Sequence, residues 1–96
     1  MVVEFLTFVV DPAERAQWLT AEESNWSRFL EQQEGFVRKQ MWVDEADPFR
    51  VHAVIWWETM EQWKAIPQAA LDEVVRNMGA YEKVPHETVY QVIRDC

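Results

Sequence analysis

Residues 36–57, FVRKQMWVDEADPFRVHAVIWW, decide the fold of this chain. The two ends of this stretch are rich in β-branched and aromatic residues, which favour extended strands. The segment between them, residues 44–48, reads Asp-Glu-Ala-Asp-Pro and has the composition of a turn. The pattern therefore predicts an antiparallel hairpin with strands over residues 36–43 and 50–57.

The segment before the hairpin predicts a strand followed by a helix. Residues 2–10, VVEFLTFVV, contain β-branched and aromatic side chains and no helix breaker, so we expect a strand. Asp11 suits an N-cap and Pro12 the first helical position. The helix is expected to reach about Glu34, where Gly35 supplies the residue that ends it.

The segment after the hairpin predicts a second helix and a last strand. Thr59 and Gln62 have the spacing of a capping box, Pro67 interrupts the helix and Gly79 closes it. Residues 87–93 then return to strand character. The order β-α-β-β-α-β predicts one α+β domain over residues 1–96, a ferredoxin-like βαββαβ sandwich with an antiparallel sheet.

Composition and charge exclude several classes of function. Nine basic residues against 17 acidic ones give a net charge of −8, which disfavours nucleic acid and anionic lipid as partners. No stretch approaches 18 apolar residues, so no membrane span is expected. The first residues carry no basic cluster typical of a secretory signal, and the one cysteine, Cys96, cannot form an internal disulfide. These features predict a cytoplasmic protein.

The six tryptophans are more bulk than one small core usually holds. We assign Trp18, Trp26, Trp57 and Trp63 to the core between helices and sheet. Both helices of this topology lie on one face of the sheet, and strand alternation gives the other face a set of large side chains. That set is Leu6, Phe8, Trp42, Val54 and Trp56.

An apolar patch of this size predicts an interface. We expect a homodimer in which two sheets face each other, forming a dimeric α/β barrel around an aromatic, partly polar cavity. The alternative is a monomer in which Trp42 and Trp56 lie on the surface of a curved sheet.

Two short motifs carry a resemblance to a known family. Glu34-Gly35-Phe36 follows the first helix, and Trp57-Glu58-Thr59-Met60-Glu61-Gln62-Trp63 spans the junction of a strand with the second helix. With these motifs and its order of elements the chain resembles the antibiotic biosynthesis monooxygenase-like superfamily of dimeric α+β barrels. It is similar to an uncharacterised cyanobacterial branch of that superfamily.

The resemblance implies a dimeric barrel that houses either cofactor-free oxygenation of phenolic polyketides or haem degradation. The haem-degrading branch uses an asparagine on the first strand, with a tryptophan and a histidine on the second helix. Here residues 2–10 contain no asparagine, and the second helix contains Trp63 but no histidine. These departures disfavour haem, and no cofactor is expected.

His52 is the candidate catalytic residue. An imidazole in an apolar pocket could take a proton from a phenol and prepare it for reaction with dioxygen. The alternative role is a structural histidine at the dimer seam. Glu4 and Arg38 are expected on the same face as His52, where they could form an ion pair. The predicted ligand-binding residues are Glu4, Phe8, Arg38, Trp42, Trp56 and Tyr90.

The remaining polar residues give no further site. Two histidines 34 positions apart, without a nearby cysteine, do not have the spacing of a zinc site. Glu22 and Glu23 are expected on a solvated face. The leading hypothesis is therefore a cofactor-independent monooxygenase acting on a small aromatic or apolar compound, and the alternative is a non-catalytic dimeric module that binds a ligand or packs solid. An enclosed cavity of roughly 300 Å³ or more beside His52 would favour a bound ligand, whereas a barrel filled by Phe8, Trp42 and Trp56 would favour a structural module.

Overall fold

Four strands form one antiparallel sheet in the computed structural model, which describes residues 1–96. The strands are β1 (Val2–Val9), β2 (Phe36–Val43), β3 (Arg50–Trp57) and β4 (His86–Gln91). Their order across the sheet is β2-β3-β1-β4, so the two halves of the chain meet at the central pair β1 and β3. The predicted hairpin is confirmed with the bounds expected from the sequence.

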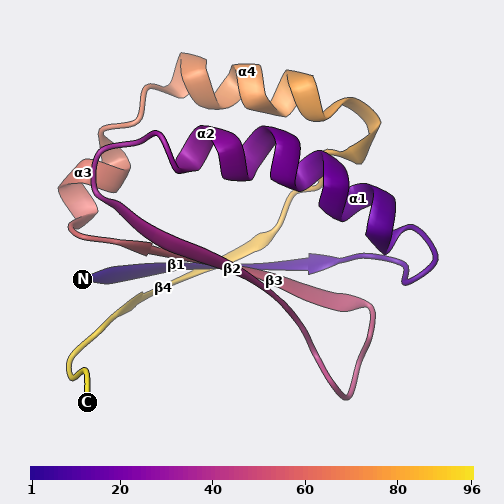
Figure 1. The fold of residues 1–96 in the computed structure, drawn as a ribbon, viewed down its shortest axis with the longest axis horizontal. Helices are drawn as coiled ribbons and strands as arrows, with labels where there is room; N and C mark the ends of the chain where they lie inside the picture. Colours follow the sequence, from indigo (N-terminus) through magenta and orange to yellow (C-terminus); the bar gives the residue numbers. More distant parts are fainter.

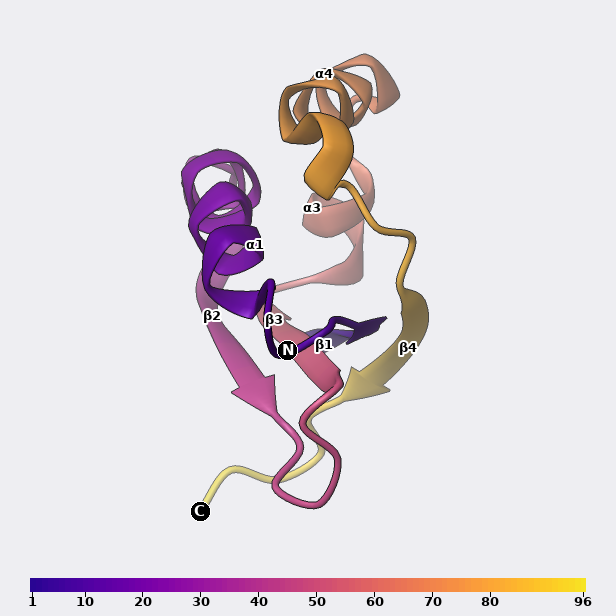
Figure 2. The ribbon, with the colours of Figure 1, turned by 90° about the vertical axis from the view of Figure 1, so that its right-hand side faces the viewer.

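The helices all lie on one face of this sheet (Figures 1 and 2). The first helical segment consists of α1 (Arg15–Glu22), the π-helix η1 (Glu23–Ser27) and α2 (Arg28–Leu30). The second consists of α3 (Met60–Lys64), α4 (Gln68–Met78) and the 3₁₀ turn η2 (Gly79–Tyr81). The predicted βαββαβ order is confirmed, with each helix divided into shorter pieces.

The ends of the helices show which local predictions hold. Thr59 caps α3 as expected, since its Oγ1 accepts a hydrogen bond of 3.1 Å from the backbone N–H of Gln62. Asp11 does not cap a helix: its carboxylate accepts from the backbone N–H of Ala13 in a turn, and α1 begins only at Arg15. Gly35 has the left-handed φ of 86° that the connection into β2 requires.

The register between β1 and β3 corrects the predicted faces of the sheet. Glu4 lies opposite Ile55 and Phe8 lies opposite Val51. Because directly opposed residues share a face, Glu4 and Phe8 point toward the helices, away from His52. The sequence-based prediction placed the face of β1 that carries Glu4 and Phe8 on the same side of the sheet as His52. A change of one residue in register moves every side chain of a strand to the other face.

The core between helices and sheet consists of two apolar clusters. One contains Phe8, Val10, Trp18, Val51, Ala53 and Met78, and the other contains Val2, Leu30, Ile55, Trp57 and Trp63. Trp18 and Trp57 are almost completely buried. The core assignment of Trp18, Trp57 and Trp63 is confirmed, and Trp26 packs against the first cluster while half-buried.

The open face of the sheet carries a second group of aromatic side chains. The Phe5 ring contacts the rings of His52, Trp42 and Tyr90, with centroids 4.8, 6.0 and 5.9 Å apart. Next to this group, the Arg38 guanidinium lies 4.2 Å from the centre of the Trp56 ring. Trp42 and Tyr90 are 44% and 53% exposed, so a large part of this aromatic surface meets solvent in the single chain. We call these six residues the open-face cluster.

Candidate functional site

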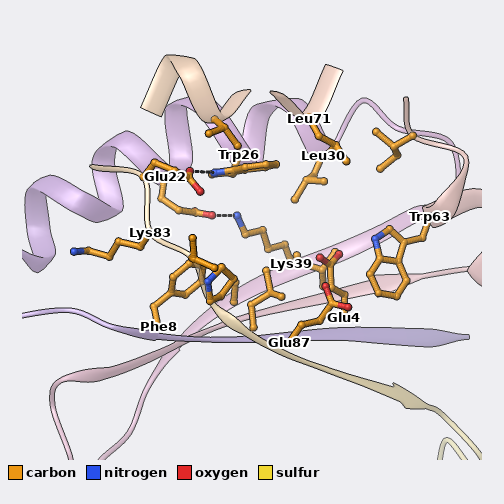
Figure 3. A pocket seen from close by; sticks show the side chains of 18 of the residues that line it. Glu4, Phe8, Glu22, Trp26, Leu30, Lys39, Trp63, Leu71, Lys83 and Glu87 are labelled. Carbon is orange, nitrogen blue, oxygen red and sulfur yellow. Dashed lines mark hydrogen bonds and ion pairs between the residues drawn. The ribbon is translucent and has the colours of Figure 1, made fainter. Parts of the chain in front are cut away.

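A cavity of about 450 Å³ lies between the sheet and the helices, on the face opposite the open-face cluster. Its floor comes from β1, β2 and β3, and its walls come from both helical segments and the segment that leads into β4 (Figure 3). Apolar side chains make up much of the lining: Leu6, Phe8, Trp26, Leu30, Ile55, Trp63, Ile66, Leu71 and Val75. This cavity is not the one predicted between two facing sheets of a dimer: it lies within one chain, and His52 does not line it.

Glu4 is the main polar group on the cavity floor. The Trp57 indole N–H donates a hydrogen bond of 3.1 Å to Glu4 Oε1, which fixes the carboxyl group over the sheet. Burial raises the pKa of Glu4 to about 7, although the Trp57 hydrogen bond opposes the shift, and the nearby charge of Glu87 raises it further. A carboxyl group in this state can gain or lose a proton near neutral pH.

A buried ion pair lies on the wall formed by the first helical segment. Lys39 of β2 reaches Glu22 of α1, and the two side chains are only 6% and 4% exposed. The Lys39 ammonium also donates a hydrogen bond of 2.8 Å to Ser27 Oγ. Burial lowers the pKa of Lys39, whereas the charge of Glu22 and its hydrogen bond raise it. Glu22 therefore does not lie on a solvated face as predicted, because Lys39 supplies its partner beneath the helix.

Trp26 crosses the upper part of the cavity (Figure 3). It belongs to the π-helix η1, and its indole N–H donates a hydrogen bond of 3.1 Å to Glu82, after α4. Burial raises the pKa of Glu82, and the Trp26 hydrogen bond opposes that shift. Insertions of this kind into a helix often occur at functional sites, since they redirect a side chain.

Trp63 forms the end of the cavity near α3. Its ring stacks on Trp57 with centroids 6.5 Å apart and planes 6° from parallel. The ammonium group of Lys64 lies over the Trp63 ring, 4.1 Å from its centre. The rings of Trp26 and Trp63 therefore line two ends of the cavity. The Glu4 carboxyl group and the Lys39–Glu22 pair lie between them.

The structure divides the predicted site residues into two groups. Glu4 and Phe8 line the cavity, whereas Arg38, Trp42, Trp56 and Tyr90 lie on the other face of the sheet with His52. The expected ion pair between Glu4 and Arg38 is wrong, because the sheet separates the two side chains. The Nδ1 atom of His52 instead makes a 2.9 Å hydrogen bond with the hydroxyl group of Thr7.

Sequence reasoning did not identify Lys39, Glu22 or Trp26 as cavity residues. Lys39 carried a signal: it stands between Val37 and Met41 in the row of β2 that alternation turns toward the helices. A lysine in such a row needs a buried partner, but the sequence does not show which helix residue supplies it.

The structure contains neither a cluster of metal-binding side chains nor a membrane-spanning helix. No three His, Cys, Asp or Glu side chains gather closely enough to hold a metal ion. No helix is long and apolar enough to cross a membrane. The cytoplasmic location stays a prediction from the sequence.

The arrangement of the whole chain is similar to that of several solved structures. A candidate antibiotic biosynthesis monooxygenase from Bordetella bronchiseptica superposes with a TM-score of 0.78 at 18% identity, over 97% of both chains. SnoaB, a cofactor-independent oxygenase from Streptomyces nogalater, gives 0.73 at 14% identity, covering 98% of this chain and 94% of its own.

A monooxygenase from Streptomyces coelicolor, solved in complex with the ligand nanaomycin D, gives 0.73 at 18% identity over 99% of this chain and 89% of its own. No protein-family model matches the chain, and no curated protein matches it in sequence. The chain therefore has the fold of the antibiotic biosynthesis monooxygenases, as the resemblance in its sequence implied.

Proposed function

We propose that this protein binds a small, flat, weakly acidic aromatic molecule in the cavity between helices and sheet, and oxidises it with dioxygen without a cofactor. The observation that carries this proposal is Glu4, a buried carboxyl group with a pKa raised to about 7, on the floor of a cavity bounded by aromatic rings. A general base works best when its pKa lies near the working pH. Glu4 therefore replaces His52 as the residue that takes the substrate proton.

The size and lining of the cavity suit a molecule of this class. Its volume of about 450 Å³ lies within the roughly 300–1,000 Å³ typical of small-molecule sites. Trp26 and Trp63 offer ring surfaces on which a flat molecule can stack. Since Glu4 lies on the floor below them, a hydroxyl group on that molecule can reach the carboxylate while the rings hold the rest.

The reaction that fits this site starts with loss of a phenolic proton to Glu4. The ionised ring is electron-rich enough to reduce dioxygen, and a methylene carbon conjugated to it supplies the remaining electrons. The methylene group becomes a carbonyl group with one oxygen atom of dioxygen, and the other atom leaves as water. The substrate is the reductant, so the balanced reaction needs no separate electron donor. The cofactor-independent oxygenation named for SnoaB supports this assignment.

Oxygen uptake with 1,8-dihydroxyanthrone, a phenol with an activated methylene group, tests the proposal. We expect uptake by the wild type and a rate lower by roughly 10²-fold in Glu4→Gln, which keeps an acceptor for Trp57 but cannot take the proton. Glu61→Gln removes an exposed carboxylate from α3 and serves as the matched control, and His52→Ala tests the earlier candidate.

Each outcome decides between the hypotheses. Equal rates in Glu4→Gln and wild type would remove Glu4 from the mechanism, and loss of uptake in His52→Ala alone would restore the histidine. Binding of the anthrone without oxygen uptake would favour the alternative, a non-catalytic ligand-binding module.

We also propose that two copies associate through the open-face cluster. Its aromatic rings gather around Phe5; Trp42 and Tyr90 are exposed in the single chain, and a second copy would cover them by two-fold symmetry. Light scattering is expected to give twice the chain mass for the wild type and the single-chain mass for Trp42→Glu. Met60→Glu, which places the same charge on an exposed apolar residue of α3, is expected to remain a dimer. A wild-type protein of single-chain mass would refute the association.

A further inference from the structure

The Lys39 ammonium at the cavity wall has hydrogen-bonding capacity that the protein does not use. It donates to Glu22 and to Ser27, which accounts for two of its three N–H groups. The side chain is only 6% exposed, so bulk water has little access to the third. Figure 3 shows the side chain rising from the sheet toward Glu22 beneath Trp26, along the wall of the cavity.

The charges around the cavity restrict the ligands that this N–H group can meet. Glu22 already balances the charge of Lys39, and the other charged groups of the lining are Glu4, Glu82 and Glu87 with Lys64 and Lys83. The lining has no excess of positive charge, so a permanently anionic ligand would bring an uncompensated negative charge into the cavity. A neutral molecule with an ionisable hydroxyl group brings no such charge, because its proton stays in the cavity when it ionises.

The positions of the two groups suit such a molecule. Lys39 stands on β2 and Glu4 on β1, on the two sides of β3 and on the same face of the sheet. Ile55 of β3 pairs with Glu4 on one side and with Lys39 on the other. The charge of each group also acts on the pKa of the other, which is consistent with their sharing one cavity.

We propose that Lys39 binds the oxygen of a phenolic ligand in its ionised form, and this inference rests on the proposed function. The ligand hydroxyl group lies between the two side chains. Its proton passes to a Glu4 carboxylate oxygen, the O–H bonding pair stays on the ligand, and the resulting phenolate oxygen accepts the free N–H of Lys39. Lys39 is thus an anion-binding residue that favours phenols over aryl ethers and over aromatic carboxylates.

Titration of bound 4-nitrophenol tests this role, because ionisation changes the absorption spectrum of the probe. We place three proteins in a Glu4→Gln background, so that the carboxyl group of Glu4 does not titrate with the probe. They carry Glu4→Gln alone, Glu4→Gln with Glu22→Gln, and Glu4→Gln with both Glu22→Gln and Lys39→Met. Near-UV circular dichroism confirms that each is folded.

The proposal predicts shifts of opposite sign. Removing Glu22 leaves the phenolate as the counter-ion of Lys39, so the pKa of the bound probe falls by roughly one unit. Removing both charges raises it by roughly one unit above the value with Glu4→Gln alone. An ion pair with only a structural role would give the same pKa of the bound probe in the protein that lacks both charges as with Glu4→Gln alone, and this result would overturn the inference.

A comparison of ligands in the wild-type protein needs no variant. Quenching of tryptophan fluorescence is expected to show at least roughly tenfold tighter binding of 4-nitrophenol than of 4-nitroanisole, which has the same ring but no ionisable hydroxyl group. Equal binding of the two would overturn the role of Lys39 while leaving the cavity as a site for aromatic rings. Binding of neither would overturn the proposed function as well.

Discussion

Replacing Glu4 with glutamine is expected to change how the stability of the protein depends on pH. In the folded chain burial raises the pKa of Glu4 from 4.5 to about 7. As pH rises between these values, Glu4 ionises in the unfolded chain while it stays protonated in the folded chain. Ionisation therefore stabilises the unfolded state relative to the folded state. The stabilising contribution of this group is therefore complete below pH 4.5 and is lost as pH rises through about 7.

The magnitude follows from the size of the shift. One pKa unit corresponds to about 1.4 kcal/mol, so the raised pKa of Glu4 corresponds to about 3 kcal/mol between pH 4 and pH 8. Glutamine has nearly the same shape and still accepts the hydrogen bond from Trp57, but it cannot ionise. The free energy of unfolding of Glu4→Gln should therefore rise relative to wild type by about 3 kcal/mol over this pH range.

Urea denaturation followed by tryptophan fluorescence, at pH values from 4 to 8, measures this difference. All other carboxylates titrate in both proteins, so their contributions cancel in the comparison. Glu61→Gln on α3 is the matched control, because it changes the net charge by the same amount at an exposed position. A difference between Glu4→Gln and wild type that stays constant with pH would refute the raised pKa. An equal rise in Glu61→Gln would assign the effect to net charge.

Three further substitutions test the buried ion pair and two local features of the backbone. Lys39→Met leaves the buried Glu22 carboxylate without a counter-ion and should cost about 3–5 kcal/mol of unfolding free energy. Lys39→Met combined with Glu22→Gln should recover most of this loss, and an equal loss in both variants would contradict the buried pair. Gly35→Ala should cost more than about 1 kcal/mol, because φ is 86° and a Cβ atom would lie 2.5 Å from the Gln62 side chain, and a neutral effect would contradict this backbone. Thr59→Ala should cost about 1 kcal/mol through loss of its cap, measured by thermal unfolding, while Thr59→Ser should retain stability.

The sequence predicts the elements of this fold well because their signals are local. Both strands of the hairpin begin and end where the composition changes, and Thr59 and Pro67 place the start and the interruption of the second helical segment. The π-helix is different. It inserts within an otherwise regular helix, and nothing in the residues 23–27 distinguishes it from α-helix.

The candidate site was harder to predict because it depends on register. Alternation sorts β1 and β3 correctly into two faces each, but it does not show which face of β1 joins which face of β3. The structure pairs Thr7 with His52 and Glu4 with Ile55, so Glu4 lies with the helices and His52 on the open face. Lys39 and Glu22 are 17 positions apart in the sequence, and their contact joins a strand to a helix. No local pattern specifies such a contact.

Phe36 shows the same limit at the other end of the hairpin. Alternation places it on the face of Arg38, but a shift of register between these two residues sets Phe36 opposite Trp57. Its ring then packs edge-on against Trp57, with centroids 6.0 Å apart, in the core beneath the helices. Irregularities of this kind move single side chains between faces without leaving a signal in the composition.

The central claim is that the cavity beneath the helices, and not the open face of the sheet, holds the ligand. The six tryptophan indole N–H groups can test it in one nuclear magnetic resonance titration with 1-naphthol. Trp26, Trp57 and Trp63 lie at the cavity or hydrogen-bond to its carboxyl groups, whereas Trp42 and Trp56 lie on the open face. We predict chemical-shift changes for the first three signals and none for Trp42 and Trp56. Changes confined to Trp42 and Trp56 would contradict the assignment of the site.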